Sequence, residues 1–552
     1  MAPYVPEEFS PEEQAVLRRY VTNLDRPVFA LVNLPEVVKG ALFARYSRSA
    51  KSLRRLFLDE FVGELDVSGD STIDATVGLR RAEQLYERVF FEYGDDSVAQ
   101  LGGVHLACEQ ASNVLTKVLE RGRLMSYLEQ STRYIAYDQR LPSGVYRYHR
   151  PPEILESSLG ARYVGDMDRM FDTYGSMLQR LVSWLAARHP RAPGDSDFVH
   201  IRALRAKALD ATRGILPAAS LSNVGIYGDG QAYEGLLLRM ATHPLPEVRE
   251  YGAMMLTELR KVIPSFLQRV DVPERGGEWA AYLAATRRDT VALVARLWPG
   301  PTAFGHGDED ARARELRRGA GPEVRLVDYD PDGEDKVLAA ICFPHGDVTE
   351  LEALERVRRL AAEERRALFQ AYVGARGNRR HRPGRAFERT GYRFEVVTDY
   401  GAFRDLQRHR ILTIEWQPLS TDLGYDLPAL VEEAGESGAF AEAMERSHAL
   451  HDALAPRFPA AAQYAIALAF RIRYVMQMNA REAMHVVELR SGSQGHPSYR
   501  RVALEMHRLI AEVAGHRHIA EAMSHVEHGP AELERLEAER HAEARRARAG
   551  RR

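Results

Sequence analysis

The spacing of apolar residues along the chain is mostly helical. "QASNVLTKVLERGRLMSYLEQ" and "AAAQYAIALAFRIRYVMQMNAREAMHVVELR" both repeat apolar residues at the three-to-four-residue spacing of an amphipathic helix. "MDRMFDTYGSMLQRLVSWLAAR" predicts another such helix. Strand-like runs are few: "RPVFALVNL", "EVRLVDY" and "YRFEVVTD". The pattern predicts an α+β protein in which small, mostly antiparallel sheets are covered by helices.

An internal repeat crosses a break in this pattern. Residues 298–322 are rich in proline, glycine and charge, which predicts a linker. On either side of it, "FALVNLPEVVKGALFARYSRS" faces "VRLVDYDPDGEDKVLAAICFP", "RGRLMS" faces "RHRILT", and "YEGLLLRM" faces "MHVVELRS". We therefore expect a first repeat over 1–297, with a helical insertion near 145–200, and a second over 323–552 that ends in a charged helix or tail. Two such repeats would form a pseudo-dimer within one chain.

Composition narrows the class of protein. A chain of 552 residues is too long for one core, and its net charge of −3 gives no global support for nucleic-acid binding. The acidic start does not resemble a signal peptide, and no apolar run is long enough to cross a bilayer. The two cysteines, Cys108 and Cys342, cannot form a disulfide framework and suit a reducing compartment. These features predict a cytoplasmic protein with no nucleic-acid or membrane partner, and catalysis without a thiolate.

The stretch "RGRLMSYLEQSTRY", residues 121–134, concentrates groups that bind phosphates and sugars. The planar fork of arginine matches phosphate or carboxylate with paired hydrogen bonds. Glu129, Ser131 and Arg133 alternate with a period of two, so in an extended loop leaving a helix they would share one face. An acceptor, a hydroxyl and a guanidinium on one face suit a nucleotide. Surface salt bridges at the end of a helix are the alternative that the pattern alone leaves open.

The same stretch resembles the signature R-H-R-x-x-S-x-N-E-x-S-x-R-Y of flavin-dependent thymidylate synthases. Its spacing is kept throughout, and the departures are Gly122 in place of His and Leu128 in place of Asn. Val118 stands where the family has a nucleotide-contacting Gln.

The second half resembles the family at other positions. Arg408-His409-Arg410 restores the R-H-R triplet, although the rest of the signature decays to "IEWQPLSTD". "MNAREAMHVVELR" resembles the family's later N-x-R segment, with His485 in place of an Asn. In the first half Gly228 and Gly230 stand where this segment would carry Asn and Arg, while Arg239 matches Arg490. The losses are complementary, which predicts one composite site between the repeats.

The resemblance implies reductive methylation of dUMP to dTMP, with methylenetetrahydrofolate as carbon donor and FAD, reduced by NADPH, as hydride source. It implies that Arg490 is the catalytic residue, which stabilises charge on the uracil ring. It also implies a homodimer that gives a pseudo-tetramer. The implied dUMP contacts are Arg121, Glu129, Ser131, Arg133 and Arg213. The implied FAD contacts are Ser97, Arg121, Arg123, Glu129, Arg408, His409, Arg410, Asn479, Arg481 and His485.

Two other interpretations remain open at this point. The substitutions at Gly122, Leu128 and His485 are also what a catalytically inactive flavin- or nucleotide-binding relative would show. "HRHIAEAMSHVEH" places His518, His525 and His528 near helical spacing, so that they can hold a metal on one face or can simply lie on a solvated helix. The solvated helix is the simpler interpretation, so we expect no metal site.

Overall fold

The computed structural model divides into two compact units, which we describe separately. Unit 1 contains Met1–Gly175, Leu216–Asp310 and Arg446–Ile466, and unit 2 contains Ser176–Ile215, Ala311–Glu445 and Ala467–Arg552. Each unit therefore includes one segment from the opposite half of the sequence. The structure describes residues 4–34, 48–61, 102–141, 143–297 and 323–529, together with the single residues 38, 39, 42, 43, 46, 100, 321, 536, 540, 543 and 544.

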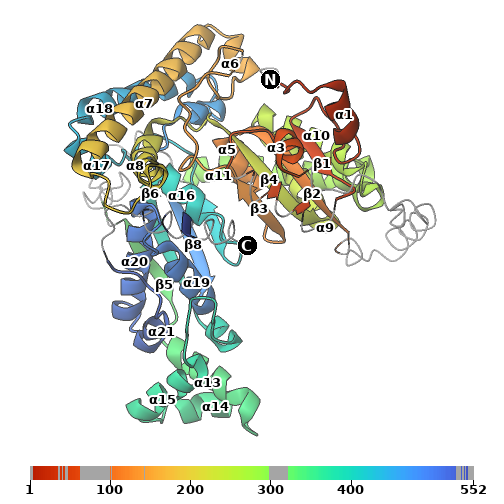
Figure 1. The fold of residues 1–552 in the computed structure, drawn as a ribbon. Helices are drawn as coiled ribbons and strands as arrows, with labels where there is room; N and C mark the ends of the chain where they lie inside the picture. Colours follow the sequence, from red (N-terminus) through yellow and green to blue (C-terminus); the bar gives the residue numbers. More distant parts are fainter. Residues whose placement is uncertain are drawn as a thin grey trace. The chain divides into compact units, whose positions relative to one another are not determined.

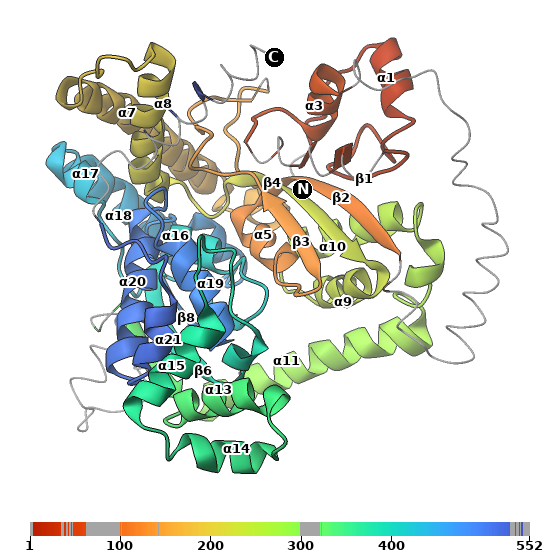
Figure 2. The same cartoon turned by 60° about the horizontal axis from the view of Figure 1, so that its bottom comes forward.

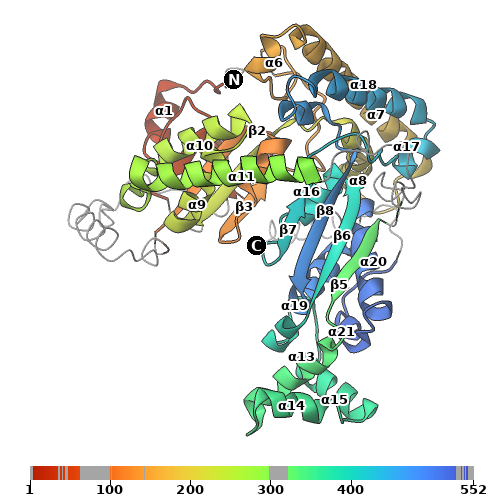
Figure 3. The same cartoon turned by 180° about the vertical axis from the view of Figure 1, so that it is seen from behind.

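Each unit is built on a four-stranded antiparallel sheet. The strand order is β1-β2-β4-β3 in unit 1 (Figure 1) and β5-β6-β8-β7 in unit 2 (Figure 3), so the two sheets correspond strand for strand. This correspondence confirms the α+β class and agrees with two tandem repeats. The strands are β1 Val28–Leu31, β2 Gly103–Ser112, β3 Met125–Glu129, β4 Leu221–Asp229, β5 Val324–Tyr329, β6 Gly391–Asp399, β7 Thr413–Trp416 and β8 Arg471–Asn479.

Helices cover each sheet in the same way. In unit 1, α9 and α10 lie against one face of the sheet (Figures 2 and 3), and in unit 2 α19 and α20 do so. The unit 1 helices are α1 Pro11–Leu17, α3 Leu53–Glu60, α5 Asn113–Leu119, α6 Pro152–Leu155, α9 Gly230–Ala241, α10 Pro246–Leu259 and α11 Glu278–Leu297. The unit 2 helices are α8 Asp197–Thr212, α13 Gly333–Cys342, α14 Glu350–Val357, α15 Ala362–Val373, α16 Tyr400–Leu406, α17 Ala429–Glu433, α19 Ala480–Arg490, α20 Pro497–Glu512 and α21 Arg517–Ala522.

Two long helices supply residues to both units: α7 Gly160–Arg188 and α18 Ser437–Leu454. The helix α7 confirms the amphipathic helix predicted in the insertion. Its buried residues recur at helical spacing, among them Met167, Phe171, Tyr174 and Leu178.

A bulge in β2 has no counterpart in the pairing of β6 with β8, although the second sheet has a register shift of its own in β5, between Leu326 and Asp328. In β2 the register shifts between Cys108 and Ala111, so that Glu109 and Gln110 lie opposite Asn223 alone. Gln110 has a φ of 55°, and its amide N–H donates to Asn223 Oδ1 at 2.9 Å. The pairing of β6 with β8 runs without such a shift. The bulge is thus the one extra residue that β2 carries relative to β6, 10 residues against 9.

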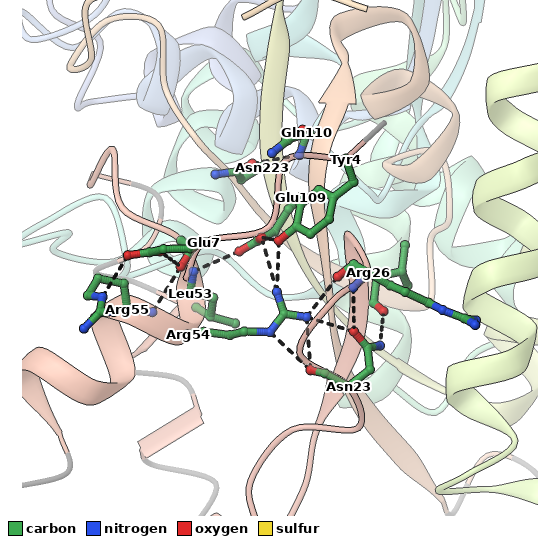
Figure 4. A network of polar contacts seen from close by, with 12 residues as sticks. Tyr4, Glu7, Asn23, Arg26, Leu53, Arg54, Arg55, Glu109, Gln110 and Asn223 are labelled. Carbon is green, nitrogen blue, oxygen red and sulfur yellow. Dashed lines mark hydrogen bonds and ion pairs between the residues drawn. The ribbon is translucent and has the colours of Figure 1, made fainter. Parts of the chain in front are cut away.

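At the bulge, Glu109 enters a buried polar network (Figure 4). Its Oε2 lies 3.6 Å from Arg54 Nη1 and accepts a hydrogen bond of 2.8 Å from the Tyr4 hydroxyl. Its Oε1 accepts from the amide N–H of Leu53 at 2.9 Å. Arg54 also donates to the carbonyl oxygens of Asn23 and Arg26. A buried charge pair with this many partners ties α3 to the sheet and is costly to break from one side.

The helical prediction was wrong over two stretches. "QASNVLTKVLERGRLMSYLEQ" contains the end of β2, then α5, then β3. "AAAQYAIALAFRIRYVMQMNAREAMHVVELR" contains a short 3-10 turn over Ala461–Ala465, then β8, then α19. β2 is buried along most of its length, and such a strand carries a continuous apolar run that periodicity cannot distinguish from a helix. β8 alternates, but the apolar run that precedes it extends the helical pattern into the strand. The three predicted strands are confirmed as β1, β5 and β6, whereas the linker, apart from Gly321, and most of the C-terminal tail lie outside the described residues.

Candidate functional site

In unit 2, three arginines converge on one carboxylate, that of Asp405 in the last turn of α16. Arg408 donates to Asp405 Oδ1. Arg213 Nη1 lies 3.5 Å from Oδ2, and Arg490 Nη1 lies 3.9 Å from Oδ1. Arg213 comes from the first half of the sequence, whereas the others come from the second. The structure therefore brings predicted residues from both halves together within one unit.

Arg213 is built into this unit as a buried cation. It begins the turn after α8, its side chain is 4% exposed, and its Nη2 atom has no hydrogen-bond partner. It also lines a cavity of about 490 Å³ together with Asp399 and His496. The pKa of Asp399 is raised by burial, against the opposing effect of Arg213. A buried guanidinium with an unused donor is suited to an anionic or carbonyl-bearing ligand.

Arg490, at the end of α19, is held on two edges. Its Nε–H donates to His409 Nε2 at 2.9 Å, and its Nη2 donates to the Asp405 backbone oxygen at 2.5 Å. Its guanidinium also lies over the ring of Tyr499, with Cζ 5.4 Å from the ring centroid. The orientation of this predicted catalytic group is thus set by the segment that carries the R-H-R triplet.

His409 is buried beside Glu482 and His485 of α19. Its Nδ1 lies 3.4 Å from Glu482 Oε1, and both carboxylate oxygens of Glu482 lie 3.2 Å from His485 Nδ1. Burial lowers the pKa of His409 to about 4. The nearby Arg490 also lowers this pKa, whereas Glu482 raises it. His409 is therefore a neutral ring at neutral pH.

The predicted FAD-binding residues of the second half also lie in this region. The contact between His409 and Glu482 joins the R-H-R segment to the first turn of α19, where Arg481 lies. Asn479 Oδ1 caps α19 by accepting from the Glu482 amide at 2.8 Å, which leaves the side-chain amide nitrogen as a donor for a ligand. Arg481 donates to the Pro383 carbonyl oxygen at 3.0 Å. Guanidinium groups beside a helix N-terminus fit the pyrophosphate of a dinucleotide.

In unit 1, the signature residues begin in β3 and continue into a turn. Glu129 ends β3, is buried, and lies 3.3 Å from Lys117 Nζ. The extended conformation expected through Arg133 is wrong, because the amides of Tyr134 and Ile135 both donate to the Ser131 carbonyl oxygen and close a turn. Arg133 is buried within that turn, so strict alternation does not set its direction. Its proposed contact with a nucleotide stays a prediction.

Arg121 and Arg123, the two arginines of the first triplet, line a separate cavity in unit 1. This cavity, of about 460 Å³, is lined by Arg121, Gly122, Arg123 and Arg239 among others. Burial and the neighbouring Arg121 lower the pKa of Arg239. Ser97, the remaining predicted flavin contact of the first half, lies outside the described residues.

The structure corrects the register of the repeat at this point. Asp229 caps α9 as Asn479 caps α19, and each is paired with the first residue of the neighbouring strand, Gly103 or Gly391. Counting from these caps, Met240 is the counterpart of Arg490, and Arg239 lies one residue earlier. Asp229, rather than Gly228, therefore stands at the Asn position.

The histidine-rich segment near the C-terminus does not form one helical face. The helix α21 ends at Ala522, before His525 and His528. His518 Nδ1 instead lies 2.9 Å from Glu334 Oε2. Within the described part of the chain, the group of side chains close enough to share a metal ion is His409, Glu482 and His485.

Sequence reasoning missed two residues that organise the site, Asp405 and Glu482. Asp405 precedes Arg408 by three residues, as Val118 precedes Arg121, so it occupies the position where the resembled family has a nucleotide-contacting Gln. This alignment with Val118 is the sequence signal that could have identified Asp405. Glu482 is visible from sequence only as the residue three before His485, a spacing that places both on one side of a helix.

Comparisons with known proteins identify the class to which this fold and site belong. The profile of the family described as "Thymidylate synthase complementing protein" matches residues 44–265 and 325–515, one region in each half. The chain belongs to that family, as a tandem of two family-like regions.

Full-length relatives carry a name that states no activity. The chain is 39% identical over 537 residues to a UPF0159 protein of Chlamydia muridarum, covering 96% of this chain and 98% of the relative. It is 31% identical over 528 residues to a UPF0159 protein of Thermoplasma acidophilum, covering 91% and 97%. A flavin-dependent thymidylate synthase of Clostridium tetani is 24% identical over 182 residues, covering 33% of this chain and 67% of that protein. Among the described residues, no helix has the length and apolar character needed to span a membrane.

Proposed function

We propose that the protein is a flavin-dependent thymidylate synthase that converts dUMP to dTMP at a composite site. The observation that carries the proposal is the cluster at Asp405, where Arg213 from the first repeat meets Arg408 and Arg490 from the second. The second repeat supplies the R-H-R triplet and the N-x-R helix, and the first supplies the sugar- and phosphate-binding signature. The two repeats then act as a pseudo-dimer, and two chains form a pseudo-tetramer.

In this proposal each group has a definite task. Arg490 stabilises the negative charge that develops on the uracil ring, as an oxyanion-type donor. Arg213, Ser131 and Arg133 hold the phosphate and sugar, and Glu129 lies beside them. Arg121 and Arg123 complete the contacts from the first triplet. FAD, when bound and reduced by NADPH, supplies the hydride, and methylenetetrahydrofolate supplies the carbon.

The flavin is assigned to the second repeat because the donors gathered there suit it. Arg408, Arg410 and Arg481 provide guanidinium groups, and the N-terminus of α19 adds backbone N–H groups. Asn479 keeps its amide nitrogen available. One flavin per chain is the expected stoichiometry, since the first repeat has Gly122 and Gln231 at the positions of His409 and Arg481.

Anaerobic turnover with dUMP, methylenetetrahydrofolate and NADPH tests the proposal, with the bound flavin quantified on the same sample by absorbance. The expected result is dTMP formation with one flavin per chain. No dTMP from protein that is fully loaded with flavin would contradict the synthase reaction. Two flavins per chain would contradict the composite site.

A second candidate is a flavin- or nucleotide-binding relative without synthase activity. The Asp405 carboxylate favours a flavin-binding relative, because it pairs with arginines that the synthase reaction would need for the phosphate of dUMP. This candidate predicts flavin or nucleotide binding without dTMP in the same assay.

A further inference from the structure

We propose that His409 and Glu482 are positioning residues for Arg490, joined in one relay: Glu482 fixes the tautomer of His409, and His409 fixes the guanidinium. The relay is formed by Glu482, His409 and Arg490, with His485 on the far side of the carboxylate. It rests on the proposed function only in assigning Arg490 to catalysis. The geometry of the relay stands without that assignment.

The tautomer follows from the donor at one end. A guanidinium N–H can only donate, so His409 Nε2, 2.9 Å from Arg490 Nε, must be the acceptor. A neutral imidazole that accepts at Nε2 carries its proton on Nδ1. That Nδ1 atom makes no hydrogen bond to the described residues, but it lies 3.4 Å from Glu482 Oε1, close enough for the carboxylate to stabilise a proton on Nδ1 electrostatically. Removing Glu482 would leave the buried N–H without this charge and free the ring to rotate or change tautomer.

Burial makes this arrangement costly to change. The side chain of His409 is 2% exposed and that of Glu482 is 5% exposed. With Nε bound to His409 and Nη2 bound to the Asp405 carbonyl oxygen, the guanidinium plane is fixed on adjacent edges. A group fixed before substrate arrives needs no reorganisation at the moment of reaction.

A metal ion is the competing interpretation of the same side chains. Two histidines and a glutamate form a familiar zinc ligand set, and the separations of 3.2 and 3.4 Å suit ligands of one ion. However, a metal on His409 Nδ1 would put the ring proton on Nε2, directly against the Nε–H of Arg490. A metal-bound histidine normally donates its other N–H to an acceptor. The geometry therefore favours the relay.

The first repeat provides an internal comparison. The two repeats can be aligned at their helix caps and at their arginine triplets. In that alignment His409 corresponds to Gly122, Glu482 to Ala232 and His485 to Gly235. The first repeat thus lacks both relay residues, His409 and Glu482, and also His485, whereas all three are present in the repeat that carries Arg490. A relay that serves Arg490 accounts for this joint presence.

The tautomer can be measured without turnover, by NMR of the full chain labelled with ¹⁵N-histidine, and the Arg490 Nε–H is followed in a second sample labelled with ¹⁵N-arginine. The signals of His409 are assigned by their loss in His409→Gln. We expect a pyrrole-type Nδ1 and a pyridine-type Nε2 at neutral pH, and a protected Arg490 Nε–H that exchanges rapidly in His409→Phe. An Nε2–H tautomer, or exchange unaffected by His409→Phe, would overturn the relay. Stoichiometric zinc binding from added zinc chloride, with a shift at His409 Nδ1, would replace it with the metal site.

Kinetics test whether the relay positions Arg490 for catalysis. His409→Phe should lower kcat by up to about 100-fold, the loss expected when a catalytic group is misplaced by about 1 Å, with a smaller change in KM. His409→Gln, which can place an amide oxygen near the former Nε2, should recover most of the loss. Glu482→Leu should lower kcat more than Glu482→Gln, since an amide oxygen still presents a partial negative charge to Nδ1–H. Equal losses in His409→Phe and His409→Gln would overturn the positioning role.

Glu488→Gln is the matched control on the same helix. Glu488 is buried and paired with Arg376 at 2.6 Å, away from the relay, so its loss affects stability and leaves the His409 tautomer unchanged. If the wild-type protein forms no dTMP, the proposed function fails, while the NMR result still decides whether the relay exists. If dTMP is formed but His409 has the Nε2–H tautomer, the relay fails and the function stands.

Discussion

The two repeats keep the same backbone and differ in the charges that it carries. Ser112 caps α5 and Asp399 caps α16, each by accepting from a backbone amide three residues later, at 3.0 and 2.9 Å. In the last turn of these helices, the second repeat has Asp405 among three arginines, whereas the first has Val118 at that position. Positions that define the fold have thus kept their chemistry, and positions that face the site have not. Under the proposed function, each copy would retain a different part of one site.

The buried pair at the β2 bulge should show the largest difference between the two sheets. Glu109→Leu leaves Arg54 buried without its carboxylate, which should lower the free energy of unfolding by about 3–5 kcal/mol. Glu395 in β6 pairs with Arg325 at 3.8 Å on a partly exposed face, so Glu395→Leu should cost less than about 1 kcal/mol. Urea denaturation followed by circular dichroism measures both. Similar costs would mean that the bulge network is no more important than a surface pair.

Substituting the arginine near the end of α19 should raise the activation free energy much more than substituting the one near the end of α9. Arg490→Ala should raise the activation free energy by about 2.7–4 kcal/mol, the loss typical of one oxyanion-stabilising donor. Arg239→Ala, one residue out of register in the other repeat, should change kcat by less than about threefold, under 1 kcal/mol. Steady-state dTMP formation compares them. Equal losses would contradict a single working site.

Acid should destabilise the second repeat through His409. Because burial holds its pKa near 4, below the value of about 6.5 for an unfolded histidine, the unfolded chain binds the proton more readily between these values. The contribution of His409 to stability is complete above pH 6.5 and is lost as the pH falls, by about 3 kcal/mol at pH 4. His409→Phe, which does not titrate, should show a flatter acid limb in pH-dependent urea unfolding. Parallel curves for the two proteins would rule out this contribution.

The smallest expected effect concerns the Asp405 carboxylate, which lies among arginines in the second repeat and is replaced by Val118 in the first. Asp405→Asn removes one negative charge beside Arg213, Arg408 and Arg490, and should tighten dUMP binding about tenfold, or about 1.4 kcal/mol. Asp426→Asn is the control, because that carboxylate pairs with Arg471 at 2.6 Å instead. Isothermal titration calorimetry gives both affinities. An unchanged dUMP affinity in Asp405→Asn would show that the arginines around Asp405 do not bind the nucleotide.

How far the sequence predicted the fold depended on how each strand is buried. The strands β1, β5 and β6 were recognised because turn residues flank short β-rich runs. The residues of β8, "RIRYVMQMN", alternate between buried and less buried positions, but the apolar run before them extended the helical pattern into the strand. β2 is buried along nearly its whole length, so its sequence has no period to detect.

The site was predicted where it repeats a known signature and missed where this chain departs from one. Arg213, Arg408 and Arg490 were all named, and the structure brings them together. Asp405 does not match the family signature, which has Gln at that position, so the resemblance gave it no role. The direction of Arg133 could not be read from alternation, because a backbone turn that depends on hydrogen bonds to Ser131 intervenes.

The reciprocal exchange of segments has a consequence for dissecting the protein. Residues 323–552 made alone would lack Ser176–Ile215, and residues 1–297 made alone would lack Arg446–Ile466. Neither polypeptide would then be a self-sufficient folding module, and each would display an apolar surface that the other normally covers. Co-expression should restore both by fragment complementation at a ratio of one to one. Severing the peptide between them therefore need not separate the two pieces.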